Sequence, residues 1–178
     1  MALTHVTEGF PGAQHMIYNQ SRMQLEGSSM AEYRAALEEL SVAYGRNLIL
    51  GENRNEGWIQ VYPGQRVWYR CGKNYKMVRG PTIASFWVDE CAWTHRKLWQ
   101  NLCARLRDKR AKRLLGVAST TLRAAAPWFR DLWDKEDDPK YRFVKAPTAD
   151  YFYLPVGYRK GLEAIMSSTY TAQELDCE

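Results

Sequence analysis

The most constraining feature of this chain is residues 83–90, which read IASFWVDE: a short apolar run that ends abruptly in two adjacent carboxylates. An apolar run of about four to eight residues bounded by charge is typical of a buried strand in a parallel sheet. Ligands of open α/β sheets bind beyond the carboxyl ends of such strands. The sequence therefore predicts that Asp89 and Glu90 lie at a ligand-binding edge.

Two interpretations of this carboxylate pair are open. In phosphoryl transfer, Asp89 would hold a magnesium ion through the water shell of that ion, while Glu90 would orient and deprotonate an attacking water. This is the logic of a Walker B motif. Alternatively, a strand simply ends here, and acidic residues begin the next helix near its positive pole. The Asp-Glu pair alone does not separate the two.

Length and composition predict one soluble domain. The chain has 178 residues, 46% hydrophobic and 25% charged, with a formal net charge of +5. No stretch has the apolar length of a membrane span, and the first residues show no secretory signal, so we expect a cytoplasmic protein and no membrane partner. The four cysteines form no CxxC pair and the three histidines have no metal-type spacing with them, which argues against structural zinc.

Strand and helix patterns alternate along the chain. We expect strands at 15–19, 83–88, 114–119 and 141–145, a hairpin whose strands flank Pro63-Gly64 within 47–70, and helices at 29–43, 93–110, 125–135 and 156–166, the first capped by Ser28 or Ser29. This alternation predicts an α/β fold with a largely parallel sheet. Core and hairpin packing explains most of the aromatic content, which includes seven tryptophans, and we do not assign Trp87, Trp128 or Trp133 to DNA.

A basic run follows the expected helix at 93–110. Its basic residues are Arg105, Arg107, Lys109, Arg110, Lys112 and Arg113. Asp108 is the one acidic residue between them. Such a run is either a solvated helix end, where cations suit the negative pole, or a contact with a phosphate backbone.

Three segments occur in a specific order: GKNYKMVRGP at 72–81, SFWVDECA at 85–92 and LLGVASTT at 114–121. Together they resemble the ATPase domain of the large terminase subunit, the DNA-packaging motor of tailed bacteriophages. In that family an Arg-Gly step precedes the Walker B strand, and a Thr-rich coupling motif ends the next strand. The flanking segments at 10–29 and from 146 onward are also similar, so the resemblance implies a partial ATPase domain over residues 1–178 with a P-loop NTPase-like (RecA-like) fold.

The resemblance implies roles for individual residues. Asp89 would bind Mg²⁺ with ATP and Glu90 would activate the hydrolytic water. Arg79 would act as an arginine finger toward a neighbouring subunit's nucleotide, or else belong to a structural turn at Gly80-Pro81.

The same resemblance makes Ser119, Thr120 and Thr121 the coupling motif that senses the γ-phosphate; the alternative is a helix N-cap. The family often carries a proline soon after these threonines, whereas Leu122 follows them here. The implied partners are double-stranded DNA, the small terminase subunit, the portal protein and further copies of the chain in a homo-oligomeric ring.

No GxxxxGK[ST] motif occurs in the sequence. The only Gly-Lys pair is Gly72-Lys73, with Val67 in place of the first glycine and Asn74 in place of the Ser/Thr. We therefore expect a fragment that lacks the P-loop, the first part of the core and the nuclease domain, and that hydrolyses ATP poorly or not at all by itself. Two other functions stay open: a non-catalytic terminase-derived remnant that serves in DNA binding or assembly, and a fragment of a helicase-type ATPase.

Overall fold

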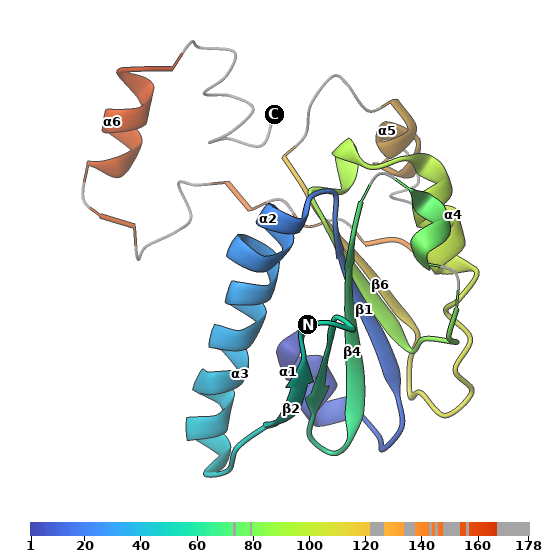
Figure 1. Ribbon diagram of the computed structural model, residues 1–178. Coiled ribbons are helices and arrows are strands. Elements are labelled where there is room, and N and C mark those ends of the chain that lie inside the picture. Colours follow the sequence, from blue (N-terminus) through green and yellow to red (C-terminus); the bar gives the residue numbers. More distant parts are fainter. Residues whose placement is uncertain are drawn as a thin grey trace. The chain divides into compact units, whose positions relative to one another are not determined.

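A computed structural model describes residues 1–72, 74–78, 80–121, 127–133, 138–142, 144, 146–147, 154–155 and 157–166. The chain divides into two compact units, Met1–Ser119 and Thr120–Glu178. The first unit contains the whole sheet (Figure 1). No helix in the described ranges is both long and apolar enough to cross a membrane.

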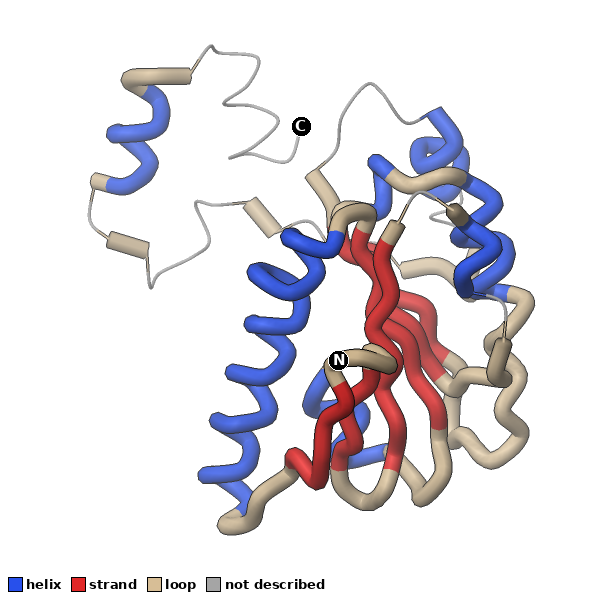
Figure 2. The backbone as a smooth tube through the Cα atoms, viewed as in Figure 1, coloured by secondary structure: helices blue, strands red, loops and turns tan. Residues whose placement is uncertain are grey.

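The sheet of the first unit has six strands in the order β2-β3-β4-β1-β5-β6. Their bounds are Ile49–Asn53 for β2, Trp58–Val61 for β3, Gln65–Cys71 for β4, Gln14–Asn19 for β1, Ser85–Asp89 for β5 and Leu115–Ser119 for β6. Strands β4, β1, β5 and β6 are parallel, and β2 and β3 add an antiparallel extension (Figure 2). The predicted α/β class, three of the four predicted strands and the hairpin around Pro63-Gly64 are confirmed.

Helices cover the two faces of the parallel strands. Helices α1 (Ala2–Glu8) and α3 (Met30–Tyr44) share one hydrophobic core with the side chains of one sheet face, among them Ile17, Val67 and Leu37, all fully buried. Helix α4 (Arg96–Cys103) packs on the opposite face (Figure 1). There the Trp99 ring meets Phe86 edge-on at a centroid distance of 5.0 Å. The apolar β1 and β5 therefore lie between two helical layers, as their continuous apolar sequences predict.

The helix predicted at 29–43 is present, but its predicted cap is wrong. The helical path begins earlier, with α2 (Arg22–Gln24) and a π-helical turn η1 (Leu25–Ser29) that run directly into α3. Ser21 is the cap, since its Oγ accepts a hydrogen bond from the Gln24 amide at 3.1 Å. Ser29 already has helical dihedral angles, and its hydroxyl serves another purpose described below.

The helix predicted to run to about residue 110 is shorter than expected. After β5 the chain forms a 3₁₀ turn η3 (Cys91–Trp93) and then α4, which ends at Cys103. The backbone at 105–107 instead pairs with Ile83, whose amide donates to the Arg105 carbonyl and whose carbonyl accepts from the Arg107 amide. Backbone pairing beside β5 thus replaces the last turns of the predicted helix. A further 3₁₀ turn, η2 (Tyr75–Val78), precedes β5.

The second unit contains helices α5 (Pro127–Trp133) and α6 (Tyr158–Glu163). They confirm the central parts of the helices predicted at 125–135 and 156–166. The strand predicted at 141–145 lies partly outside the described residues. Tyr141, Arg142 and Val144, which are described, are not in a strand.

Candidate functional site

Polar side chains gather at the carboxyl ends of three parallel strands. Asn19 ends β1, Asp89 ends β5 and Ser119 ends β6. The strand register pairs Asp89 with Ser119 and places Asn19 one residue beyond the Tyr18–Val88 pair. Because paired residues of a parallel sheet point to the same face, the three side chains converge on one side of this edge. We call this group, together with Ser29, the carboxyl-edge cluster.

The Asp89 carboxylate is the centre of this cluster. Its Oδ1 accepts hydrogen bonds from Ser119 Oγ at 2.7 Å and from the Glu90 amide at 3.1 Å. Its Oδ2 accepts from Ser29 Oγ at 2.8 Å and from Asn19 Nδ2 at 3.4 Å. Ser29 comes from η1, so a helical turn on one side and two strands on the other fix one carboxylate orientation.

Ser119 is itself held in place. Its Oγ accepts a hydrogen bond from the Trp87 indole Nε1 at 2.7 Å and donates its own proton to Asp89. Since a hydroxyl has one proton, this arrangement leaves one orientation for the Ser119 hydroxyl. Any ligand that draws the Ser119 proton away would release one oxygen of Asp89.

The donors around Asp89 bear on how it can hold a cation. A carboxylate has about four lone-pair sites, and four donors occupy those of Asp89. Within the described ranges no group of three or more His, Cys, Asp or Glu side chains could coordinate a metal. Mg²⁺ commonly keeps several waters and uses one or two carboxylates together with substrate phosphates. The residues present therefore fit Mg²⁺ held through water in the outer shell of Asp89.

Glu90 has an unusual backbone conformation. Its φ of 50° and ψ of 46° are left-handed, and it is the one non-glycine residue with a positive φ in the described part of the chain. This conformation costs roughly 1 kcal/mol or more for a residue with a Cβ, and such strain clusters at functional sites. This turn ends β5 and starts η3, and Glu90 is half-buried there. The second carboxylate of the pair therefore belongs to a backbone turn, whereas the first belongs to the strand.

The structure describes the two threonines of the predicted coupling motif but not the predicted arginine finger. Thr120 and Thr121 follow β6 directly in the chain and belong to the second unit, where Thr120 Oγ1 donates to the Thr121 carbonyl at 3.3 Å. Arg79 lies outside the described residues. The neighbouring Gly80 has a φ of +154° and its carbonyl accepts from Arg105 Nη1 at 3.0 Å.

The basic run lies near the amino ends of β5 and β6, in the segment that leads into β6 at Leu115. Three of its side chains make contacts within the first unit: Arg105 with Gly80, Arg113 with Glu8 at 2.7 Å, and Arg110 with both oxygens of Asp108. The Arg110 guanidinium also stacks over Phe10 and lowers the pKa of Asp108. Arg107, Lys109 and Lys112 are exposed. The structure therefore does not bring the basic run to the carboxyl-edge cluster.

Sequence reasoning did not identify Asn19 and gave Ser29 a different role. A signal for Asn19 was available, because a polar residue ends the apolar run HMIY just as Asp89 ends its own run. No comparable signal exists for Ser29, since it reaches Asp89 only through the π-helical turn of η1.

A second buried polar cluster lies near the amino ends of the same strands. We call it the amino-edge cluster; its side chains are Tyr33, His5, Ser85, His15 and Gln65, each at most 4% exposed. Gln65 Nε2 donates to two backbone carbonyls, so its Oε1 must accept from His15 Nε2, at 2.7 Å. His15 Nδ1 then accepts from the Ser85 hydroxyl at 2.8 Å, and Ser85 Oγ accepts from His5 Nε2 at 3.0 Å.

Tyr33 completes this chain by donating to His5 Nδ1 at 2.7 Å. Both imidazoles must be neutral for every donor to meet an acceptor. Burial lowers the pKa of His15 to about 4 and lowers the pKa of His5 well below its ordinary value, an effect to which the neighbouring His15 adds. The cluster has no exposed member and contains only groups that satisfy one another.

Comparison with known proteins identifies a family. The family model of the terminase large subunit, T4likevirus-type, N-terminal, matches residues 52–178. Comparison with curated proteins found no match.

Solved structures share the fold. The large terminase of a thermophilic bacteriophage has a TM-score of 0.81 at 12% identity, covering 97% of this chain and 42% of that one. Structures of the same phage protein with ADP and with ATP-γ-S have TM-scores of 0.80 and 0.76 at 10% and 12% identity. Each match covers 99% of this chain, together with 42% of the ADP-bound protein and 45% of the ATP-γ-S-bound protein.

Two further large terminases are similar. The ATPase domain of the Thermus phage P74-26 protein has a TM-score of 0.68 at 14% identity, and the match covers 99% of this chain and 80% of that one. The HK97 bacteriophage protein has a TM-score of 0.58 at 14% identity, and the match covers 96% of this chain and 37% of that one. The chain thus spans about two fifths of the length of the first of these large terminases, and at these identities the likeness shows the fold. With its family model matched over residues 52–178, the chain belongs to the terminase large subunit family.

Proposed function

We propose that this chain is part of a viral DNA-packaging motor, in which ATP hydrolysis drives double-stranded DNA into a procapsid. The observation that carries this proposal is the Asp89 carboxylate, fixed by four donors at the tip of β5 and followed by Glu90 in a left-handed turn. Family membership supports the assignment to packaging rather than to another ATPase. Residues 1–178 would form a partial ATPase domain of that motor.

Glu90 is our candidate general base. When bound, Mg²⁺–ATP supplies the electrophilic γ-phosphoryl group and the positive charge that stabilises the phosphates. Glu90 accepts a proton from the attacking water and orients that water in line with the bond that breaks. Asp89 would hold a magnesium ion through the water molecules bound to that ion. The two adjacent carboxylates would have separate tasks because Asp89 is saturated with hydrogen bonds at the strand tip and Glu90 belongs to the turn that follows.

Ser119 is our candidate sensor of the γ-phosphate, with Thr120 and Thr121 completing the coupling motif. The hydroxyl of Ser119 links Trp87 and Asp89, so loss of the phosphate can change which acceptor receives its proton. We also propose Arg79 as an arginine finger toward a neighbouring copy's nucleotide, where a guanidinium stabilises charge on the transferring phosphoryl group.

The sequence contains no P-loop to hold the β- and γ-phosphates through backbone amides. ATP turnover therefore requires a P-loop from outside these 178 residues, and we expect little or none without it. Strand β6 is at one end of the sheet order, beside β5. A P-loop strand that paired with β6 would bring phosphate-binding amides next to Ser119 and Asp89.

The test measures magnesium-dependent ATP hydrolysis by this chain alone and by this chain mixed with the product of the adjacent upstream reading frame. We expect turnover in the mixture only, and we expect Glu90→Gln to lower it by at least about 10²-fold. Glu38→Gln is the matched control, because Glu38 is an exposed carboxylate on α3.

Two outcomes would contradict this proposal. Turnover by the chain alone that Glu90→Gln abolishes would disprove the requirement for an external P-loop. A folded chain that gives no turnover in any mixture would favour the alternative, a non-catalytic DNA-binding or assembly protein.

The implied partners are double-stranded DNA, the small terminase subunit, the portal protein and further copies of the chain in a ring, all within the host cytoplasm. For duplex DNA we propose backbone contacts by the basic run, through its exposed members Arg107, Lys109 and Lys112. Salt-sensitive duplex binding that is indifferent to Glu90→Gln would support this contact independently of catalysis.

A further inference from the structure

A pocket of about 330 Å³ lies beyond the end of β1, between η2 and the start of α4. Its walls include four aromatic rings, those of Tyr18, Tyr75, Trp93 and His95, and two hydrogen-bonding side chains, Gln20 and Thr94. The volume is within the range of small-ligand sites. All of these residues belong to the first unit.

The aromatic walls are held by local structure. The Trp93 amide donates to the Glu90 carbonyl at 3.0 Å, and Thr94 Oγ1 donates to the Cys91 carbonyl at 2.7 Å. The rings of Tyr75 and His95 stack with centroids 5.3 Å apart and planes tilted by 36°. Trp93 is nevertheless 46% exposed, so its side chain lies largely outside the core. An exposed aromatic ring in the wall of a pocket is suited to stacking on a flat ligand.

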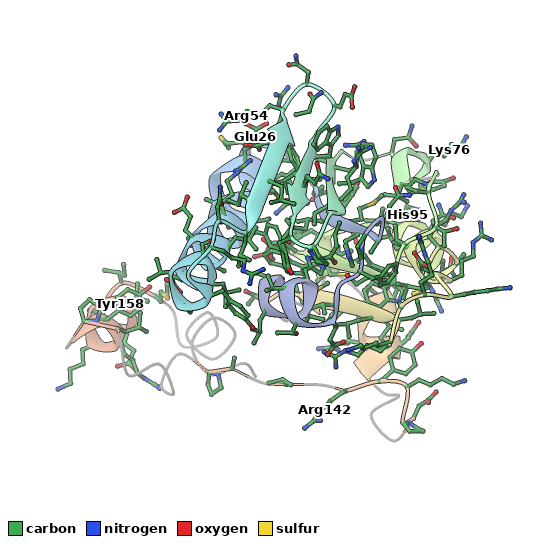
Figure 3. All side chains as sticks on the ribbon, turned by 90° about the horizontal axis from the view of Figure 1, so that it is seen from below. Glu26, Arg54, Lys76, His95, Arg142 and Tyr158 are labelled. Carbon is green, nitrogen blue, oxygen red and sulfur yellow. The ribbon has the colours of Figure 1, made fainter. Side chains whose placement is uncertain are left out.

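Positive charge surrounds the pocket. Lys97 Nζ lies 5.6 Å from the centroid of the Tyr75 ring, and Lys76 on η2 is exposed on the same side of the molecule as His95 (Figure 3). Arg96 and Lys97 occupy the first turn of α4, which has no acidic residue. These two cations add their charge to the positive pole of the helix, which attracts anions. These charges select against a cationic ligand and for one that carries a phosphate.

The sheet face beside the pocket also carries aromatic rings and cationic groups. On β4, Trp68 lies between two guanidinium groups, with Arg70 4.7 Å and Arg66 5.4 Å from its ring centroid. Arg66 also stacks at 4.6 Å over Trp58 of the neighbouring strand β3. The register pairs Arg70 with Tyr18, so this ladder is on the face to which Tyr18 points, and it ends beside the pocket. Alternating aromatic and cationic groups are typical of surfaces that bind single-stranded nucleic acid.

We propose that this pocket binds a nucleotide unit, with the base stacked on Trp93 and the phosphate near Lys97. The unit is either a free mononucleotide or an unpaired nucleotide of a DNA strand that continues along the Arg66–Trp68–Arg70 ladder. The site is distinct from the carboxyl-edge cluster and needs neither a P-loop nor ATP turnover. Its test can therefore fail or succeed independently of the proposed packaging function.

The test measures fluorescence anisotropy of a short labelled oligo(dT) titrated with the full chain at low salt, with dTMP, dAMP and a duplex of mixed sequence as competitors. We expect Trp93→Ala to weaken oligo(dT) binding by about 10-fold or more. Lys97→Gln should also weaken it and should make binding less dependent on salt concentration. Trp93→Phe keeps a stacking face and should restore most of the affinity, which a purely structural role would not predict.

Matched controls lie away from the pocket. Tyr44→Ala removes another 46% exposed aromatic, at the end of α3, and Arg54→Gln removes an exposed cation from the turn after β2. Neither should change oligo(dT) binding. Competition by dTMP or dAMP identifies a mononucleotide site, and oligo(dT) binding that neither mononucleotide displaces identifies a strand site; both support the proposal. Binding that is unchanged by Trp93→Ala in a folded chain, or binding of duplex only, overturns it.

Discussion

The same face of the same parallel strands carries a polar cluster at each end, and the two clusters differ in kind. Strand β1 contributes His15 near its amino end and Asn19 at its carboxyl end; β5 contributes Ser85 and Asp89. Between them lie Ile17 and Trp87. At the amino edge each donor meets one acceptor and all members are buried, whereas at the carboxyl edge four donors converge on one half-buried carboxylate.

This difference in hydrogen bonding and exposure distinguishes a structural network, the amino-edge cluster, from a candidate functional site, the carboxyl-edge cluster. The amino-edge cluster has no donor or acceptor to offer a ligand, because its five side chains and two backbone carbonyls satisfy one another. The carboxyl-edge cluster concentrates negative charge at a partly accessible point and is followed by a strained backbone turn. We therefore expect the first cluster to matter for stability and the second for chemistry, and four predictions test that division.

The largest expected effect is on the amino-edge cluster. His15→Ala leaves the Gln65 Oε1 acceptor and the Ser85 hydroxyl without partners and opens a cavity, so the free energy of unfolding should fall by roughly 3–5 kcal/mol. Urea denaturation followed by circular dichroism measures it. Met23→Ala, at a side chain that is 83% exposed, is the control and should change stability by less than about 0.5 kcal/mol. A loss below about 1 kcal/mol for His15→Ala would contradict the assigned network.

The second effect is on the pH dependence of stability. Because the pKa of His15 is about 4 in the folded state and 6.5 in the unfolded state, the unfolded chain binds more protons between these values. Stability is then fully present above pH 6.5 and should fall by about 2 kcal/mol from pH 7 to pH 5 through His15 alone. The lowered pKa of His5 acts in the same direction.

Unfolding curves across this pH range provide the measurement. His15→Gln lacks the titrating group, so its stability should fall less steeply between pH 7 and pH 5. Equal slopes for the two proteins would show that other groups cause the pH dependence.

The third effect is on the carboxyl-edge cluster and is smaller. Asp89→Ala removes the acceptor for Ser29 and Ser119, but water can reach this edge, so we expect a loss of roughly 1–2 kcal/mol. A double-mutant cycle with Ser119→Ala should give a coupling energy of about 1 kcal/mol. If Asp89→Ala destabilised the chain more than His15→Ala, the division between structural and functional clusters would be wrong.

The smallest effect, of opposite sign, is at Glu90. Glycine adopts a left-handed backbone without strain, so Glu90→Gly should raise stability by about 0.5–1 kcal/mol while removing the candidate base. Glu38→Gly in the middle of α3 should instead lower stability by about 1 kcal/mol. Thermal unfolding of both variants measures this contrast, and a destabilising Glu90→Gly would mean that the side chain stabilises the fold.

Much of the fold was predictable because it depends on local patterns. The apolar runs at 15–19, 83–88 and 114–119 are strands, and the Pro63-Gly64 turn joins β3 and β4. The helix predicted to reach residue 110 was wrong because backbone pairing between Ile83 and 105–107, distant in sequence, replaces its last turns. The cap of the first long helix was wrong for a related reason: the chain enters α3 through a π-helical turn that aims Ser29 at Asp89.

The sequence by itself determined which polar residues stand at strand tips, since an apolar run that ends in Asp-Glu or Ser-Thr-Thr is a local pattern. The tertiary structure decided which side chains meet. Asn19, Ser29 and Ser119 reach one carboxylate only because β1, η1 and β6 come together around β5. It also decided that Trp93 is exposed while His5 and His15 are buried, because burial depends on what packs against a residue and not on its own spacing.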